Sequence, residues 1–219
     1  MNVSPEHRMI WWTKPCMGEK IVASCFFSHY FVNYGKKDTL PLTAKDNISF
    51  IQKIPQDFED FSIILSIRNP YFQIINHYLD ISHTNWKLKT NTIDHFKEKL
   101  NAWVQEIFSV KKETLLSIDS LVQFVLPYNL DNHTPSFVLH YEDLEKDLKN
   151  LPFIDQNLFY FNQNLMVDNT AFEMNTLDYK SAQLIYKIHK KTFEQFGYDP
   201  FSFTTQELSL KEKVDFIHS

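Results

Sequence analysis

The sequence contains few cysteines, glycines and arginines. Its 219 residues include two cysteines and three glycines, and every basic residue except Arg8 and Arg68 is a lysine. Two cysteines, Cys16 and Cys25, cannot form a disulfide framework, and free thiols fit a reducing compartment. Because the chain uses lysine almost everywhere, each of its two arginines is a candidate for a specific role.

Long apolar runs and an excess of positive charge are also absent. No apolar run approaches the ~18–20 residues that a membrane span needs, and the N-terminal residues lack the cationic region of a signal peptide. We therefore expect a cytoplasmic chain with no membrane partner. The net charge of −5 at pH 7 argues against a nucleic-acid partner bound through a generally basic surface. One local anion site is compatible with this charge.

The composition is that of a folded protein. Apolar residues make up 43% of the chain and charged residues 22%, which separates it from disordered sequences. The length suits a single domain with a full core. We expect one α/β domain over residues 1–203, in which residues 80–135 form a helical cap on the sheet. Residues 204–219 are expected to form a C-terminal tail or a peripheral helix.

Apolar runs alternate with amphipathic periods along the chain, which predicts an α/β fold with a mostly parallel central sheet flanked by helices. The predicted strands are residues 9–13, 47–54, 61–67 and 136–141. The predicted helices are residues 21–32, a helix that begins at Pro70, and residues 92–108, 142–150 and 179–196, while residues 119–126 fit either a helix or a strand. The run at 61–67 is mostly apolar and rich in isoleucine, which is typical of a central parallel strand covered on both faces.

Two helix ends carry specific signals. Asn69 is a good N-cap, and Pro70 suits the first helical position. Apolar residues then recur with a helical period, so the strand at 61–67 is followed directly by a helix. Gly197 follows the predicted final helix, where a left-handed C-terminal cap belongs.

Two loops are candidates for an anion site. In open parallel sheets, ligands bind beyond the carboxyl ends of the strands, and a helix N-terminus attracts anions. The loop at 13–20 supplies Lys14 and Lys20, and the loop at 68–70 supplies Arg68. Two cationic strand ends suit a ligand with two separated phosphates. The first loop lacks the Walker A pattern G-x-x-x-x-G-K-[ST], which argues against a metal–nucleoside triphosphate site.

Four segments, in this order, resemble the sulfotransferases that use 3′-phosphoadenosine-5′-phosphosulfate (PAPS). The segment IRNPYFQIINHY (67–78) is similar to the family motif R-[ND]-P-Y-[DE]-R-x-x-S-x-Y. A looser similarity joins WWTKPCMGEKI (11–21) to the family loop P-K-x-x-[GS]-[ST]-[ST]. Residues 137–154 resemble a later strand and helix of the family, and residues 190–200 resemble its C-terminal FGY segment. The resemblance implies the P-loop NTPase-like fold of that family.

The resemblance also implies roles for individual residues. Lys14 falls at the position of the loop lysine that stabilises the leaving phosphate oxygen, and Arg68 falls at the position that holds the 3′-phosphate. Asn76 occupies the serine position of the motif at 67–78 and would donate an amide N–H. The rest of the first loop would hold the 5′-phosphosulfate, although Glu19 and Lys20 replace the hydroxyl residues of the family; its members here are Cys16, Met17, Gly18, Glu19 and Lys20.

The general base is the least defined part of this prediction. Sulfuryl transfer needs a group that takes the proton of the acceptor, and no metal is expected in the reaction. We select Asp38, a carboxylate in the loop after the first helix, where the resemblance places a base. Glu19, His29 and His77 are the alternatives.

The predicted activity is transfer of a sulfuryl group from PAPS, which leaves PAP, to a hydroxyl or amine of a small molecule or glycan. A catalytically inactive relative that acts as a binding or scaffold protein is the first alternative, because the first loop departs from the family pattern. A P-loop nucleotide kinase is the second. For Arg68 the structural alternative is an ion pair at a strand end, and for Lys14 it is a solvated surface position. The sequence contains no indication of the acceptor or of the oligomeric state.

Overall fold

The computed structural model describes residues 2–4, 8–13, 32–33, 60–83, 93–108, 127, 134–154, 161 and 175–218. The chain divides into two compact units, which are described separately. The sheet unit comprises Met1–Arg68 and Tyr128–Val167, and the helical unit comprises Asn69–Pro127 and Asp168–Ser219. The boundary between Arg68 and Asn69 falls inside the motif at 67–78.

The sheet unit contains a five-stranded mixed sheet with the strand order β3-β1-β2-β4-β5. The neighbouring strands β2, β4 and β5 are parallel to one another. Strand β1 pairs antiparallel with both β2 and β3. The strands are β1 (Asn2–Ser4), β2 (Met9–Trp12), β3 (Val32–Asn33), β4 (Ser62–Ile67) and β5 (Phe137–His140). This arrangement confirms an α/β fold with three parallel strands.

Two strands differ from the prediction. The sequence analysis did not predict β1 or β3, and β3 places Val32 in a strand, so the predicted helix over 21–32 is wrong at that residue. The predicted strand at 47–54 and the undecided segment 119–126 lie outside the described residues. The predicted strands at 9–13, 61–67 and 136–141 correspond to β2, β4 and β5.

The central strand β4 is buried as its apolar sequence predicts. Ile64 and Leu65, whose side chains point to opposite faces of the sheet, are both fully buried. Ser66 is the polar exception near the end of the strand, and its hydroxyl accepts a hydrogen bond of 2.7 Å from the indole Nε1 of Trp11 on β2. The hydroxyl therefore provides a buried partner for the indole N–H.

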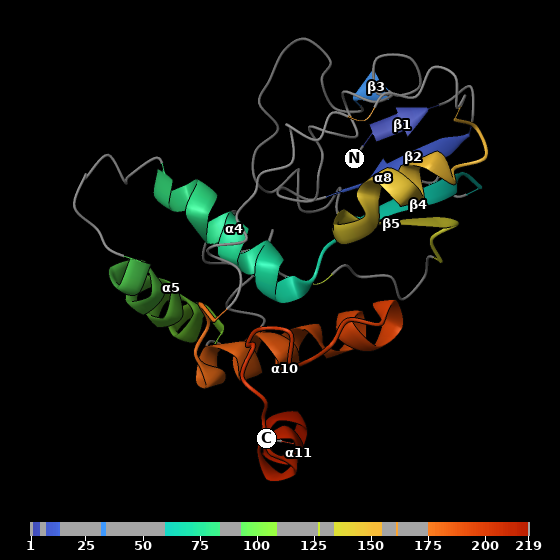
Figure 1. Cartoon of the computed structure of the whole chain (residues 1–219). Helices are drawn as coiled ribbons and strands as arrows, with labels where there is room; N and C mark the ends of the chain where they lie inside the picture. Colours follow the sequence, from blue (N-terminus) through green and yellow to red (C-terminus); the bar gives the residue numbers. More distant parts are fainter. Residues whose placement is uncertain are drawn as a thin grey trace. The chain divides into compact units, whose positions relative to one another are not determined.

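A short helix covers one face of this sheet. After β5 the chain forms the 3₁₀ turn η3 (Tyr141–Asp143) and the helix α8 (Leu144–Lys149), and Figure 1 shows α8 lying over the sheet. Leu144 and Leu148 of α8 pack against Met9, Trp11, Ile64, Leu139 and Leu151. Most charged side chains of the segment 142–150 point to solvent, as expected for a charged helix with one apolar stripe.

The helical unit is built around α10 (Tyr179–Phe196), which contacts α4 (Pro70–His83), α5 (Ile93–Phe108) and α11 (Leu210–His218) (Figure 1). The predicted helices at Pro70, 92–108 and 179–196 are thus confirmed. A large part of the core is aromatic. Its buried rings are Tyr71, Phe96, Phe108, Tyr186, Phe193, Phe203 and Phe216.

The ends of α10 and α11 follow ordinary capping rules. The side chain of Asp178 accepts a 2.7 Å hydrogen bond from the backbone N–H of Ser181 at the start of α10. Gly197 ends α10 in the left-handed conformation at φ 71°, as predicted, and its N–H donates to the carbonyl of Phe193. The C-terminal segment contains α11, which buries Phe216 in the helical core. None of the described helices has the length and apolar character needed to cross a membrane.

Candidate anion site at the carboxyl end of the sheet

The predicted site residues divide into those that the structure describes and those that it does not. Arg68 and Asn76 are described. The predicted catalytic residues Lys14 and Asp38 lie outside the described residues. The same holds for the other members of the first loop, which are Cys16, Met17, Gly18, Glu19 and Lys20.

Arg68 is the first residue after the central strand β4, and its side chain is buried, with 4% of its surface exposed. The guanidinium carbon lies 3.9 Å from the centre of the Tyr141 ring, which is a close cation–π contact. The structural alternative for this arginine was an ion pair with an acid. The contact with the Tyr141 ring is one that this alternative did not include.

Tyr141 reaches this position because β4 and β5 are parallel neighbours. Ile67, the last residue of β4, is paired with His140, the last residue of β5. Arg68 and Tyr141 therefore leave the sheet at the same carboxyl edge, where ligands of parallel sheets bind. The sequence analysis included Tyr141 in a segment that resembles the family but gave it no role. The usable signal was an aromatic residue directly after a predicted parallel strand.

His140 and Asp147 form a second arrangement that the sequence analysis missed. One carboxylate oxygen of Asp147 lies 2.8 Å from the backbone nitrogen of His140, which donates to it, and 3.0 Å from Nδ1 of the same residue. Asp147 belongs to α8, so these contacts attach the end of β5 to that helix. They fix the backbone immediately before Tyr141.

Asn76 belongs to the helical unit and lies on α4, with 4% of its surface exposed. Its amide nitrogen donates a 2.8 Å hydrogen bond to the carbonyl of Phe72, one turn earlier in the same helix. This bond uses one of the two amide hydrogens. Gln73 and His77, which neighbour it on α4, are also buried.

Two other residues of the motif at 67–78, Asn69 and Tyr71, hold the helical unit together. The Asn69 side chain caps α4 by accepting from the N–H of Tyr71 at 3.1 Å, and its amide donates to the hydroxyl of Ser202 at 2.7 Å. The Tyr71 hydroxyl donates to the carbonyl of Pro200 at 2.7 Å, and its ring lies 4.9 Å from that of Phe193. Burial raises the pKa of the Tyr71 phenol well above its ordinary value, so the hydroxyl stays protonated as a donor.

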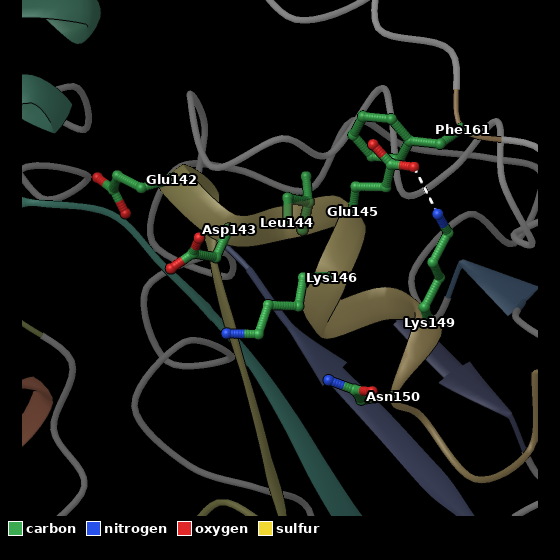
Figure 2. A pocket seen from close by; sticks show the side chains of 8 residues that line it. All are labelled: Glu142, Asp143, Leu144, Glu145, Lys146, Lys149, Asn150 and Phe161. Carbon is green, nitrogen blue, oxygen red and sulfur yellow. Dashed lines mark hydrogen bonds and ion pairs between the residues drawn. The ribbon is translucent and has the colours of Figure 1, made fainter.

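An open pocket of about 490 Å³ is lined by residues of η3 and α8 and by Phe161 (Figure 2). Its charged lining is mixed, with three carboxylates and two lysines, and Lys149 pairs with Glu145 at 2.6 Å across it. The described residues that line it are Glu142, Asp143, Leu144, Glu145, Lys146, Lys149, Asn150 and Phe161. Neither Arg68 nor Asn76 is among them, and the mixed charges favour neither an anion nor a cation.

Comparisons with known proteins do not add to this picture. No protein family, no curated protein and no solved structure matches the chain. Within the described ranges there is also no group of three or more histidine, cysteine, aspartate or glutamate side chains that could hold a metal ion. The functional argument therefore starts from Arg68 and its surroundings.

Proposed function

We propose that this protein is a sulfotransferase that moves a sulfuryl group from PAPS to a hydroxyl or amine of a small molecule or glycan. The observation that carries the proposal is the buried guanidinium of Arg68 at the carboxyl end of the central parallel strand. A phosphate group of the nucleotide is the ligand that this position suits best. The four segments that resemble the family supply the identity of the nucleotide.

The contact with Tyr141 is compatible with phosphate binding. A guanidinium binds an aromatic ring through its flat face, whereas it binds a phosphate through the N–H groups along its edge. The 3.9 Å contact with Tyr141 engages the face. A lysine in this place would offer a point charge rather than a planar fork, which gives a physical reason for one of the two arginines of a lysine-rich chain to lie here.

The proposed reaction divides the work among four residues. PAPS supplies the sulfuryl group, whose bond to the leaving phosphate oxygen breaks as the bond to the acceptor oxygen or nitrogen forms. Lys14 stabilises the negative charge that develops on the leaving oxygen, and Asp38 takes the proton of the acceptor. Arg68 orients the nucleotide through its 3′-phosphate, and the resemblance assigns a part in nucleotide binding to Asn76.

The first test is thermal unfolding with and without PAP. At a PAP concentration of about 100 Kd, binding should add about 2.7 kcal/mol to the free energy of unfolding. For a chain of this size each kcal/mol raises Tm by roughly 2–4 °C. We expect a rise of several degrees in the wild type and a much smaller rise in Arg68→Ala.

The second arginine provides a matched control. Arg8 is exposed and pairs with Asp60 at the surface. Arg8→Ala therefore removes the same side chain and the same charge without touching the candidate site, and it should keep the full PAP effect. Loss of the effect in both variants would mean that PAP binds through general charge, and no effect in the wild type would reject the proposed function.

Sulfate transfer then separates the enzyme from its inactive relative. With PAPS and a panel of acceptors, the wild type should transfer sulfate and Lys14→Ala should not. PAP binding without transfer to any acceptor would favour the binding or scaffold protein. Magnesium-dependent ATP binding in the absence of PAP binding would favour the nucleotide kinase.

A further inference from the structure

The contact between Arg68 and Tyr141 joins two strand ends that are far apart in the sequence. Both side chains are buried, with 4% of Arg68 and 8% of Tyr141 exposed. Each residue directly follows its strand, and the paired residues Ile67 and His140 keep the two strand ends in register. The ring of Tyr141 therefore lies at a fixed place beside the guanidinium.

The backbone before Tyr141 is held by α8. Asp147 accepts hydrogen bonds at 2.8 Å from the backbone nitrogen of His140 and at 3.0 Å from its Nδ1. Leu144 and Leu148 anchor the same helix to the sheet. The position of the Tyr141 ring thus depends on a packed helix.

A long arginine side chain loses much rotamer freedom when it binds a ligand. A ring that holds the guanidinium beforehand reduces this loss, because the fork is already oriented when the anion arrives. The ring also supplies a favourable electrostatic contact where the cation is withdrawn from water. Both effects make Arg68 a better anion receptor than a mobile surface arginine.

We propose that Tyr141 is a positioning residue that holds the guanidinium of Arg68 in place for a phosphate group of the nucleotide. This inference rests on the proposed function, since it assigns the phosphate to PAP or PAPS. Tyr141 acts through Arg68 by means of its ring face, and its hydroxyl is not required. Replacing the ring should therefore weaken binding, while removing the hydroxyl should not.

The test compares PAP affinity by calorimetry in ring variants. Tyr141→Phe keeps the ring and should bind PAP within about twofold of the wild type. Tyr141→Leu removes the ring and should bind up to about tenfold more weakly, which is the cost of immobilising one long side chain on binding. A series of fluorinated phenylalanines at position 141 keeps the shape of the ring but withdraws electrons from its face. Affinity should fall with each added fluorine, which a packing role alone would not produce, and this series serves if Tyr141→Leu does not fold.

A double-mutant cycle shows whether Tyr141 acts through Arg68. In an Arg68→Ala background, the further change Tyr141→Leu should leave the weak residual PAP affinity unchanged. Additive losses would overturn the proposal, because they would mean that Tyr141 contacts the nucleotide itself. Equal affinities of the wild type, Tyr141→Leu and the fluorinated variants would overturn it as well.

Inorganic pyrophosphate separates this inference from the proposed function. If the wild type binds pyrophosphate but not PAP, and both Arg68→Ala and Tyr141→Leu weaken that binding, the proposed function fails and the positioning role stands. If PAP binds and the cycle is additive, the function stands and the positioning role fails. If neither ligand binds, both are rejected.

Discussion

The motif at 67–78 joins two regions with different tasks. Arg68 belongs to the sheet unit, where it contacts Tyr141. Asn69 and Tyr71 belong to the helical unit, where they bind Ser202 and Pro200 of the C-terminal segment. Among the adjacent residues Arg68, Asn69 and Tyr71, the first is a candidate ligand-binding residue and the other two hold the fold.

This difference changes how the resemblance should be weighed. Two of the four similar segments, 67–78 and 190–200, are linked directly by the hydrogen bond from the Tyr71 hydroxyl to the carbonyl of Pro200. A protein that had lost its activity would still need Asn69 and Tyr71 to fold. Arg68 is therefore the residue whose replacement distinguishes an active nucleotide site from an inherited fold.

The largest expected effect concerns the aromatic core of the helical unit. Phe193 is 1% exposed and its ring lies 4.9 Å from that of Tyr71 and 5.4 Å from that of Tyr186. Phe193→Ala should lower the free energy of unfolding by about 3–5 kcal/mol, measured by urea denaturation. Amide hydrogen exchange should show the loss first in α4, α5 and α10. A uniform loss over β2, β4 and β5 as well would mean that the two units unfold as one.

A smaller effect is expected at the end of α10. Gly197 has φ 71°, and a Cβ added there would meet nothing within 4 Å. The cost of Gly197→Ala therefore comes from the backbone conformation alone, which is about 1–2 kcal/mol for a residue with a side chain. Asparagine tolerates this conformation better, so Gly197→Asn should cost less. A loss of PAP binding in Gly197→Ala would contradict the division of tasks between the units.

The comparison inside the motif is sharpened by Tyr71→Phe. Removing the hydroxyl leaves the carbonyl of Pro200 without this donor and should cost about 1 kcal/mol of unfolding free energy. The PAP-induced rise in Tm should remain. Arg68→Ala should show the opposite result, with most of the rise lost. If Tyr71→Phe removed the PAP effect, the motif would act as one functional element rather than two.

The smallest effect is a pH dependence confined to α11. The hydroxyl and the backbone N–H of Ser209 donate hydrogen bonds of 2.6 and 2.8 Å to Glu212, which holds the pKa of that carboxyl below its ordinary value. The charged form is thus favoured by folding, so its contribution is present above the pKa of unfolded glutamate and is lost as the pH falls through the folded pKa. An NMR titration of Glu212 should show the lowered pKa in the wild type. In Ser209→Ala, which removes the hydroxyl donor, the pKa should move back toward its ordinary value.

The sequence predicted those elements whose signals are local. An unbroken apolar run followed by Asn69 and Pro70 defines both β4 and the start of α4, and Gly197 defines the end of α10. The strands β1 and β3 have three and two residues, which is too short for a period to be recognised. They form because each pairs with a neighbouring strand. The sequence of one segment alone does not predict such pairing.

The candidate site was predicted in part for the same reason. Arg68 was accessible to the sequence analysis because it stands at a strand end and is one of two arginines. Tyr141 becomes significant only when β5 is placed next to β4, and no local pattern fixes that pairing. Asp147 received no role in the sequence analysis, because no local pattern around it predicts its two hydrogen bonds with His140.

The position of α10 also has a consequence for how the protein is made. This helix contacts both α4 and α5, yet it begins at Tyr179, whereas α5 ends at Phe108. During synthesis at about 5–20 residues per second, the two earlier helices leave the ribosome on the order of ten seconds before the helix that covers them. Their apolar faces lack that partner throughout this interval. The nascent chain therefore exposes apolar surface, and is prone to aggregation, until its C-terminal third has emerged.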